Sequence, residues 1–202
     1  MDAALATAPD RARALAHEHL VPLGVRFDHT VGVANRAVAL VGPLRLDPGQ
    51  AATLVAAAWL HDLAYAPTLA AVGFHPVDFH PLDGATWLFG QGWPDEICRL
   101  VAHHTDAVEQ ARRRGIDGAL RRFPEPEPTL AAALAWCDLH TSPTGLPVGL
   151  ETRRAEVRSR YGPDHSVPRA MDTAWPRLVS WCSWIDSLVS RAGRTAGVSA
   201  MS

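Results

Sequence analysis

The chain has 202 residues, and its 19 basic and 21 acidic side chains leave a formal net charge of −2. All of these basic residues are arginines, so chemistry that needs a lysine, such as a Schiff base, is excluded. The charge balance also excludes the broad positive surface of a protein that binds a nucleic-acid polymer or a polybasic membrane surface. At about 100–200 residues per domain, the length predicts one domain.

The expected compartment follows from the cysteines and the apolar runs. Cys98, Cys137 and Cys182 are odd in number and far apart, unlike a disulfide framework or a CxxC metal site. Residues 1–4 carry an acid where a signal peptide would be basic, and no long apolar run follows them. The longest apolar run, residues 54–60, is too short to span a bilayer. We therefore expect a cytoplasmic protein without a membrane span.

Leucine and alanine recur at helical spacing along nearly the whole chain, and few runs alternate with period two. The sequence therefore predicts an all-α, single-domain helical bundle. Caps, glycines and prolines between the apolar runs predict helices over residues 10–20, 28–41, 48–64, 82–89, 94–106, 129–140, 150–161 and 168–191. Loops are expected over residues 67–81 and 141–149, and the arginine-rich residues 112–122 are expected to cover a solvated face.

The two ends of the chain lie outside this periodic pattern. Residues 1–9 are expected to be a flexible N-terminus, and residues 192–202 a flexible tail. The predicted helical domain therefore covers residues 10–191. Within it, residues 124–128 alternate proline with glutamate, which predicts a stiff connector.

Histidine and aspartate occur together at the ends of several apolar helices. The pair His61-Asp62, for example, follows an alanine-rich apolar helix, where burial is costly unless the polar groups are paired or bound to a metal. One such residue alone is usually a satisfied core group or a helix cap. The whole set, however, offers the mixed nitrogen and oxygen donors of a transition-metal site. The set consists of His29, His61, Asp62, His80, His103, His104 and Asp138.

The order of these residues, H…HD…D, resembles the signature of the HD-domain metal-dependent phosphohydrolase superfamily. The segments that carry the resemblance are residues 27–31, 58–64, 80–85, 101–104 and 135–138. The resemblance covers about residues 25–140 and implies a helical bundle of the HD-domain type, with the metal site between its central helices. The ligands it implies for one divalent ion are His29, His61, Asp62 and Asp138. The ligands it implies for a second ion are His80, His103 and His104, with Asp62 bridging the two ions.

Two details of the resemblance bear on the site. A second His-Pro pair begins at His75, and we prefer His80 as the ligand because Gly84 and a predicted helix follow it. Many relatives carry a lysine three residues after the His-Asp pair that helps to handle phosphate, whereas this chain has Tyr65 there.

The resemblance implies hydrolysis of a phosphomonoester or phosphodiester by metal-activated water, with a small phosphorylated metabolite or nucleotide as substrate. Asp62 is the expected catalytic ligand. Arg26, one turn before His29, and Arg99, one turn before His103, are the expected substrate-binding cations. The implied cofactor is one or two divalent ions, and the donor set does not separate Mn, Fe, Co, Ni, Zn and Mg.

Two other functions stay open. An HD-family di-iron oxygenase uses a similar set of six histidine and aspartate ligands, and redox iron would distinguish it. A non-catalytic sensor domain would keep the same ligands to bind a metal or a nucleotide. The expected partner is the small phosphorylated substrate, with no nucleic-acid polymer and no membrane, and formation of a homo-oligomer stays open.

Overall fold

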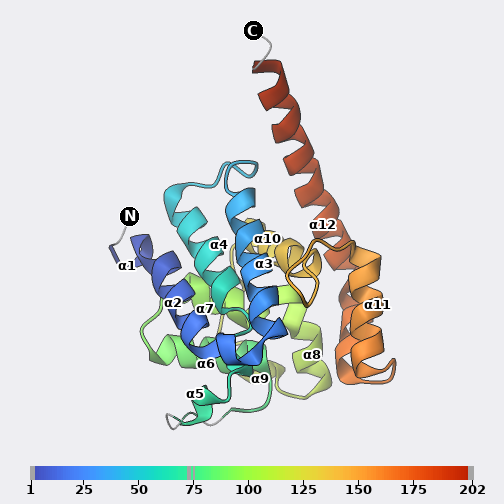
Figure 1. Cartoon of the computed structure of the whole chain (residues 1–202). Helices are drawn as coiled ribbons and strands as arrows, with labels where there is room; N and C mark the ends of the chain where they lie inside the picture. The colour runs from blue at the N-terminus through green and yellow to red at the C-terminus, as the bar shows by residue number, and fades with distance from the viewer. Residues whose placement is uncertain (1–2, 72–73, 75, 200–202) are drawn as a thin grey trace.

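The structure is a computed structural model that describes residues 3–71, 74 and 76–199. Over these residues the chain is helical, and its extended pairing is a single bridge between Thr141 and Pro147. The prediction of an all-α fold is confirmed. The helices (Figure 1) are α1 (Ala3–Ala6), α2 (Ala8–Leu20), α3 (Val25–Leu40), α4 (Pro48–Leu60), α5 (Thr68–Ala71), α6 (His80–Gly90), α7 (Asp95–His103), α8 (Ala107–Arg113), α9 (Asp117–Leu120), α10 (Pro128–Leu139), α11 (Leu150–Tyr161) and α12 (Ser166–Ser199).

Helix α4 is the centre of the fold, with α2, α3, α7 and α10 packed around it. Its central alanines are fully buried, because small side chains let the neighbouring helices approach closely. A capping box begins it: the Asp47 carboxylate accepts from the backbone of Gly49 at 2.8 Å and of Gln50 at 2.9 Å. The helix ends directly before His61 and Asp62, so the capped central helix carries this pair into the core.

The ends of the helical region differ from the expected boundaries. Helix α2 begins at Ala8, within the segment expected to be flexible, because Ala8 and Ala12 are fully buried where α2 packs on α4. Helix α12 continues through Ser199, beyond the expected end near residue 191. Leu188 and Val189 still pack against the core close to that end, and the remaining turns extend from the body in Figure 1.

Two other segments contain helices that periodicity did not predict. Helix α5 lies inside the expected loop of residues 67–81, and its Leu69 is buried in the core. The arginine-rich residues 112–122 include the end of α8 and the short helix α9, whose Leu120 is also buried. Such short helices leave almost no periodic signal in the sequence.

Helices α11 and α12 form a hairpin on one side of the body (Figure 1). Gly162, with φ of 81°, ends α11 in a conformation that favours glycine. Arg154 donates to Asp172 Oδ1 from Nε at 3.0 Å and from Nη2 at 2.8 Å, and Arg158 pairs with the other oxygen. The hydrogen bonds from Arg154 lower the pKa of Asp172, so this carboxylate ties the two helices together.

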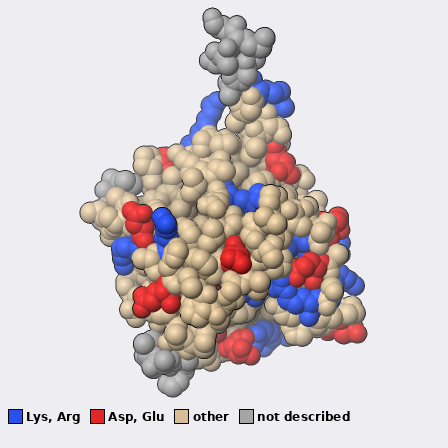
Figure 2. Space-filling view, in the orientation of Figure 1, with Lys and Arg blue, Asp and Glu red and all other residues tan. Residues whose placement is uncertain are grey.

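The three cysteines, Cys98, Cys137 and Cys182, are buried as free thiols, as the sequence predicted. Burial raises the pKa of Cys98 to about 12. On the face shown in Figure 2, acidic and basic side chains are interspersed among neutral ones. No described helix is both long enough and apolar enough to cross a bilayer.

Candidate metal centre

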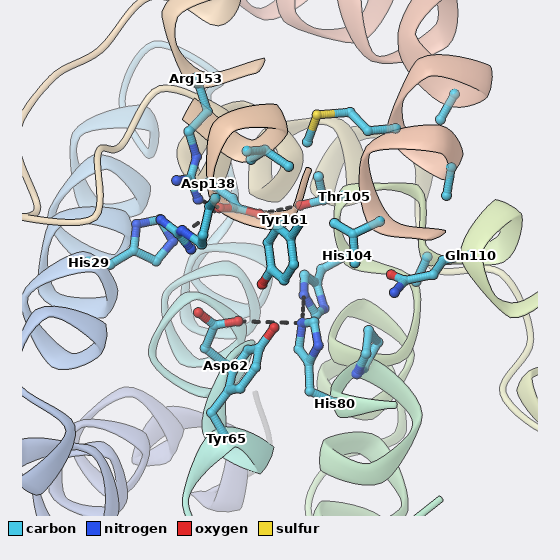
Figure 3. A pocket seen from close by; sticks show the side chains of 18 of the residues that line it. His29, Asp62, Tyr65, His80, His104, Thr105, Gln110, Asp138, Arg153 and Tyr161 are labelled. Carbon is cyan, nitrogen blue, oxygen red and sulfur yellow. Dashed lines mark hydrogen bonds and ion pairs between the residues drawn. The ribbon is translucent and has the colours of Figure 1, made fainter. Parts of the chain in front are cut away.

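Five segments bring histidine and aspartate side chains to one pocket near the middle of the molecule (Figure 3). The side chains form two groups of three, and within each group the donor atoms lie within 4.8 Å of one another. The first group is His29 from α3, His61 from the end of α4 and Asp138 from α10. The second group is Asp62, His80 from the start of α6 and His104 from the turn after α7.

In the first group, backbone carbonyls fix which ring nitrogen of each histidine faces the pocket. Nδ1 of His29 lies 3.0 Å from the carbonyl oxygen of Ser142, and Nδ1 of His61 lies 2.9 Å from that of Ala58. A carbonyl oxygen only accepts, so we infer that each Nδ1 donates a hydrogen to its carbonyl and that each Nε2 is the nitrogen turned toward the pocket. Carbonyl bonds of this kind are typical of metal-binding histidines.

The two inward-facing nitrogens of this group fit a cation. Nε2 of His29 lies 3.1 Å from Asp138 Oδ1, so this nitrogen and this carboxylate oxygen face each other. Nε2 of His61 is buried and has no hydrogen-bond partner among the described residues. Burial lowers the pKa of His61, which keeps the ring neutral and able to donate to a metal. A bound divalent ion would satisfy both nitrogens.

The aspartate of this group is held as a carboxylate. Burial alone would raise the pKa of Asp138, but the hydrogen bond with His29 and the charge of Arg153 hold it well below its usual range. Thr105 donates to the Oδ2 atom from its hydroxyl. Asp138 Oδ1 is therefore the oxygen that faces the histidines.

The second group repeats the pattern. Nδ1 of His104 lies 2.6 Å from the carbonyl oxygen of Val101, which leaves its Nε2 facing Nε2 of His80 at 3.2 Å. Burial lowers the pKa of His80 to about 3, so this ring is also neutral near pH 7. Two imidazole rings that point nitrogens at each other beside a carboxylate make a donor set that suits Mn, Fe, Co, Ni or Zn.

Asp62 lies between the two groups. Its Oδ2 atom is 3.5 Å from Nε2 of His61 in the first group, and its Oδ1 atom is 3.5 Å from Nε2 of His80 in the second. Arg26 donates from Nη1 to Oδ2 at 2.7 Å. Although burial alone would raise the pKa of Asp62, His61 and Arg26 hold it well below its usual range, so Asp62 stays ionised.

Tyr65 occupies the position where many relatives carry a lysine. Its ring stacks on His80 with centroids 4.3 Å apart, and Cζ of Arg26 lies 3.9 Å from the centroid of the Tyr65 ring. Burial raises the pKa of Tyr65, so its hydroxyl stays protonated near neutral pH. The cation in this part of the pocket is therefore Arg26, and Tyr65 contacts both that arginine and the predicted ligand His80.

Two sequence-predicted site residues lie elsewhere. His103 Nε2 is 2.8 Å from the carbonyl oxygen of Phe123, outside both donor groups. Adjacent helical residues point about 100° apart, so one of the His-His pair faces the pocket and the other faces away. Arg99, one turn before His103, shares its outward direction and pairs with Asp95 and Glu96 instead. The reserve ligand His75 lies outside the described residues.

The sequence interpretation missed Thr105 and Arg153, which both contact Asp138. Thr105 follows the His-His pair without any motif of its own. The sequence did contain one indication of Arg153, because this residue lies at helical spacing between Leu150 and Val157, on the side of α11 that packs inward. A charged residue in an apolar stripe is unusual enough to mark a site.

Helices α11 and α12 form the wall of the pocket opposite the donor groups. Val167 and Met171 from α12 make that wall apolar, and Tyr161 from the end of α11 points toward the donors in Figure 3. Arg153 and Arg160 from α11 add positive charge at the same side. One side of the pocket thus carries the two donor groups, and the opposite side, formed by α11 and α12, is partly apolar and partly positively charged.

Fold and site together define an all-helical domain with two adjacent groups of side chains that could each hold a metal ion. The family model of the HD domain matches residues 26–141, more than half of the chain, so the chain belongs to the HD-domain family. The matched region includes all six donor residues and ends before α11 and α12. This superfamily consists mostly of metal-dependent hydrolases. Searches of curated proteins and of solved structures found no match to the chain.

Proposed function

We propose that this protein is a phosphohydrolase that uses two divalent ions and acts on a small phosphorylated metabolite or nucleotide. The observation that carries this proposal is the position of Asp62, whose two oxygens face one donor group each at 3.5 Å. A carboxylate in that position suits a bridging ligand between two ions. Paired ions at a shared carboxylate are a common arrangement for displacement at phosphorus.

The charge around the pocket supports an anionic substrate. Arg26, Arg153 and Arg160 line it together with Asp62 and Asp138, and each of these two carboxylates also lies close to a donor nitrogen. Two divalent ions would add further positive charge. A phosphoryl group carries the negative charge that such a pocket attracts.

When bound, divalent ions supply a water of lowered pKa and neutralise charge on the phosphoryl oxygens. The chain's own residues prepare the site for this chemistry. Arg26 orients the Asp62 carboxylate, and His29 with Thr105 orients Asp138. The apolar side chains Val167 and Met171 reduce access of bulk water from the side of α12.

The test begins with elemental analysis of protein purified without chelators, followed by a panel of phosphomonoesters and phosphodiesters with Mn²⁺. We expect two ions per chain and release of phosphate or of a phosphomonoester from at least one compound. Asp62→Asn should lower the metal content and reduce turnover at least about 100-fold while the helical circular dichroism is kept. The exposed Asp164→Asn is the matched control and should leave both measurements unchanged.

Each other outcome has a distinct meaning. Full activity in Asp62→Asn would show that the site has been assigned wrongly. Bound iron with oxygen consumption and no phosphate release would identify the di-iron oxygenase instead. Metal and nucleotide binding without turnover of any compound would identify the sensor domain.

A further inference from the structure

Arg153 is a buried arginine whose hydrogen bonds are incomplete. Arg153 is 7% exposed, and its Nε atom has no hydrogen-bond partner among the described residues. Nη1 has a close acceptor, since it donates to Glu156 Oε2 at 2.6 Å. Nη2 lies 3.5 Å from Asp138 Oδ1, which is long for a charge-assisted hydrogen bond. The Nε and Nη2 edge of the guanidinium therefore lacks a close acceptor.

The Nε and Nη2 edge of Arg153 lies beside the candidate metal centre. Figure 3 shows Arg153 reaching down from α11 toward Asp138, beside His29. Glu156 holds the opposite edge of the guanidinium, and Glu156 is itself shared with Arg160. The unfilled edge consequently lies on the side of the guanidinium nearest Asp138, and both residues line the pocket.

A purely structural role explains these contacts poorly. Asp138 already has Thr105 on one oxygen and His29 on the other, so it does not need Arg153 to fix its orientation. Buried donors in native proteins almost always have partners, and an unpaired buried donor marks a missing ligand or another functional role. The Nε and Nη2 pair of an arginine matches two oxygens of a phosphoryl group in bidentate geometry.

We propose that Arg153 binds the phosphoryl group of the substrate through Nε and Nη2, at the end of the pocket formed by His29, His61 and Asp138. The inference rests on the proposed phosphohydrolase function and makes it more specific. Arg153 lies outside residues 26–141, so the α11–α12 hairpin, and not the family core, supplies this contact. The substrate-binding cation expected at Arg99 is thus replaced by one on α11.

The test measures binding of inorganic phosphate and of phenylphosphonate, which resembles a phosphomonoester and resists hydrolysis, by calorimetry. Measurements are made on Mn²⁺-loaded and metal-free protein. Arg153→Met keeps the buried stem and removes the guanidinium, and it should weaken binding of both probes about 10- to 100-fold. Arg153→Lys should restore little of the loss, since one ammonium does not reproduce the fork. Arg112→Met, at an exposed arginine outside the pocket, is the matched control.

Affinity for Mn²⁺ separates substrate binding from ligand positioning. We expect it to change less than about threefold in Arg153→Met, because Thr105 and His29 still hold Asp138. Unchanged phosphate binding in folded Arg153→Met and Arg153→Lys overturns the inference and leaves the phosphohydrolase proposal standing. A loss of Mn²⁺ affinity with normal phosphate binding at saturating Mn²⁺ also overturns it, in favour of a positioning role. A wild-type protein that binds neither probe overturns both proposals.

Discussion

Thr105 has φ of 49°, a conformation that β-branched residues rarely adopt. Such a residue stores about 1–3 kcal/mol of strain, which the surrounding structure must offset. Its position explains why the strain is kept. The kink separates α7 from α8, so His104 turns into the pocket, and the Thr105 hydroxyl reaches Asp138. Strain at this residue is therefore coupled to the orientation of two predicted ligands.

Thr105→Val should weaken metal binding about 10- to 100-fold, because Asp138 loses the donor that fixes its Oδ2 atom. Mn²⁺ titration of metal-free protein measures the effect. Thr105→Ser keeps the hydroxyl and should stay within a few-fold of wild type. Equal loss in both variants would mean that the backbone, rather than the hydroxyl, carries the effect.

For single residues, the sequence predicted which residue types form the site better than it predicted where each side chain points. The structure brings together His29, His61, Asp62, Asp138, His80 and His104, the six members of the predicted set that form the two donor groups. His103 is chemically identical to His104, and only the exact end of α7 separates them. A positive φ at a threonine and an unpaired nitrogen in a buried arginine depend on tertiary packing, which no local pattern encodes.

Two glycines let the loop after α10 lie against α3. A Cβ atom at Gly32 would be 2.4 Å from the carbonyl oxygen of Gly145, and one at Gly145 would be 2.4 Å from that of Asp28. This close approach places the Ser142 carbonyl next to His29 Nδ1. The packing of one loop on one helix thus orients the ring of a predicted ligand.

Gly32→Ala should push this loop away from α3, cost about 1–3 kcal/mol of stability and weaken Mn²⁺ binding. Chemical denaturation and Mn²⁺ titration measure the two effects. Gly42→Ala is the control, since a Cβ there meets nothing within 4 Å. If Gly32→Ala loses stability but keeps wild-type metal affinity, the loop does not orient His29 as inferred.

Long helices were predictable because their apolar period, caps and glycine ends agree with one another. The capped start of α4 and the end of α11 at Gly162 are examples. The short helices α5 and α9 have too few residues to show a period. Helix α12 continues through Ser199, beyond the last apolar residues that pack on the core, so the apolar pattern alone does not show where it ends.

For the whole molecule, metal binding should be linked to folding, because the donors come from segments that are far apart in the sequence. Mn²⁺ at about 1,000 times its dissociation constant should stabilise the native state by about 4 kcal/mol and raise Tm by roughly 10 °C. A chelator should reverse the rise, and Asp62→Asn should largely lack it. Thermal unfolding followed by circular dichroism makes the measurement; an equal rise in Asp62→Asn would place the stabilising ion elsewhere.

The buried thiols have a practical consequence. Cys98, Cys137 and Cys182 are buried on three different helices, α7, α10 and α12. Only an exposed, ionised thiol reacts quickly with a disulfide reagent, and burial raises the pKa of Cys98 to about 12. Each thiol should therefore become reactive only when its helix opens. The protein carries three natural reporters of native-state opening, which mass spectrometry can read one by one without any labelling mutation.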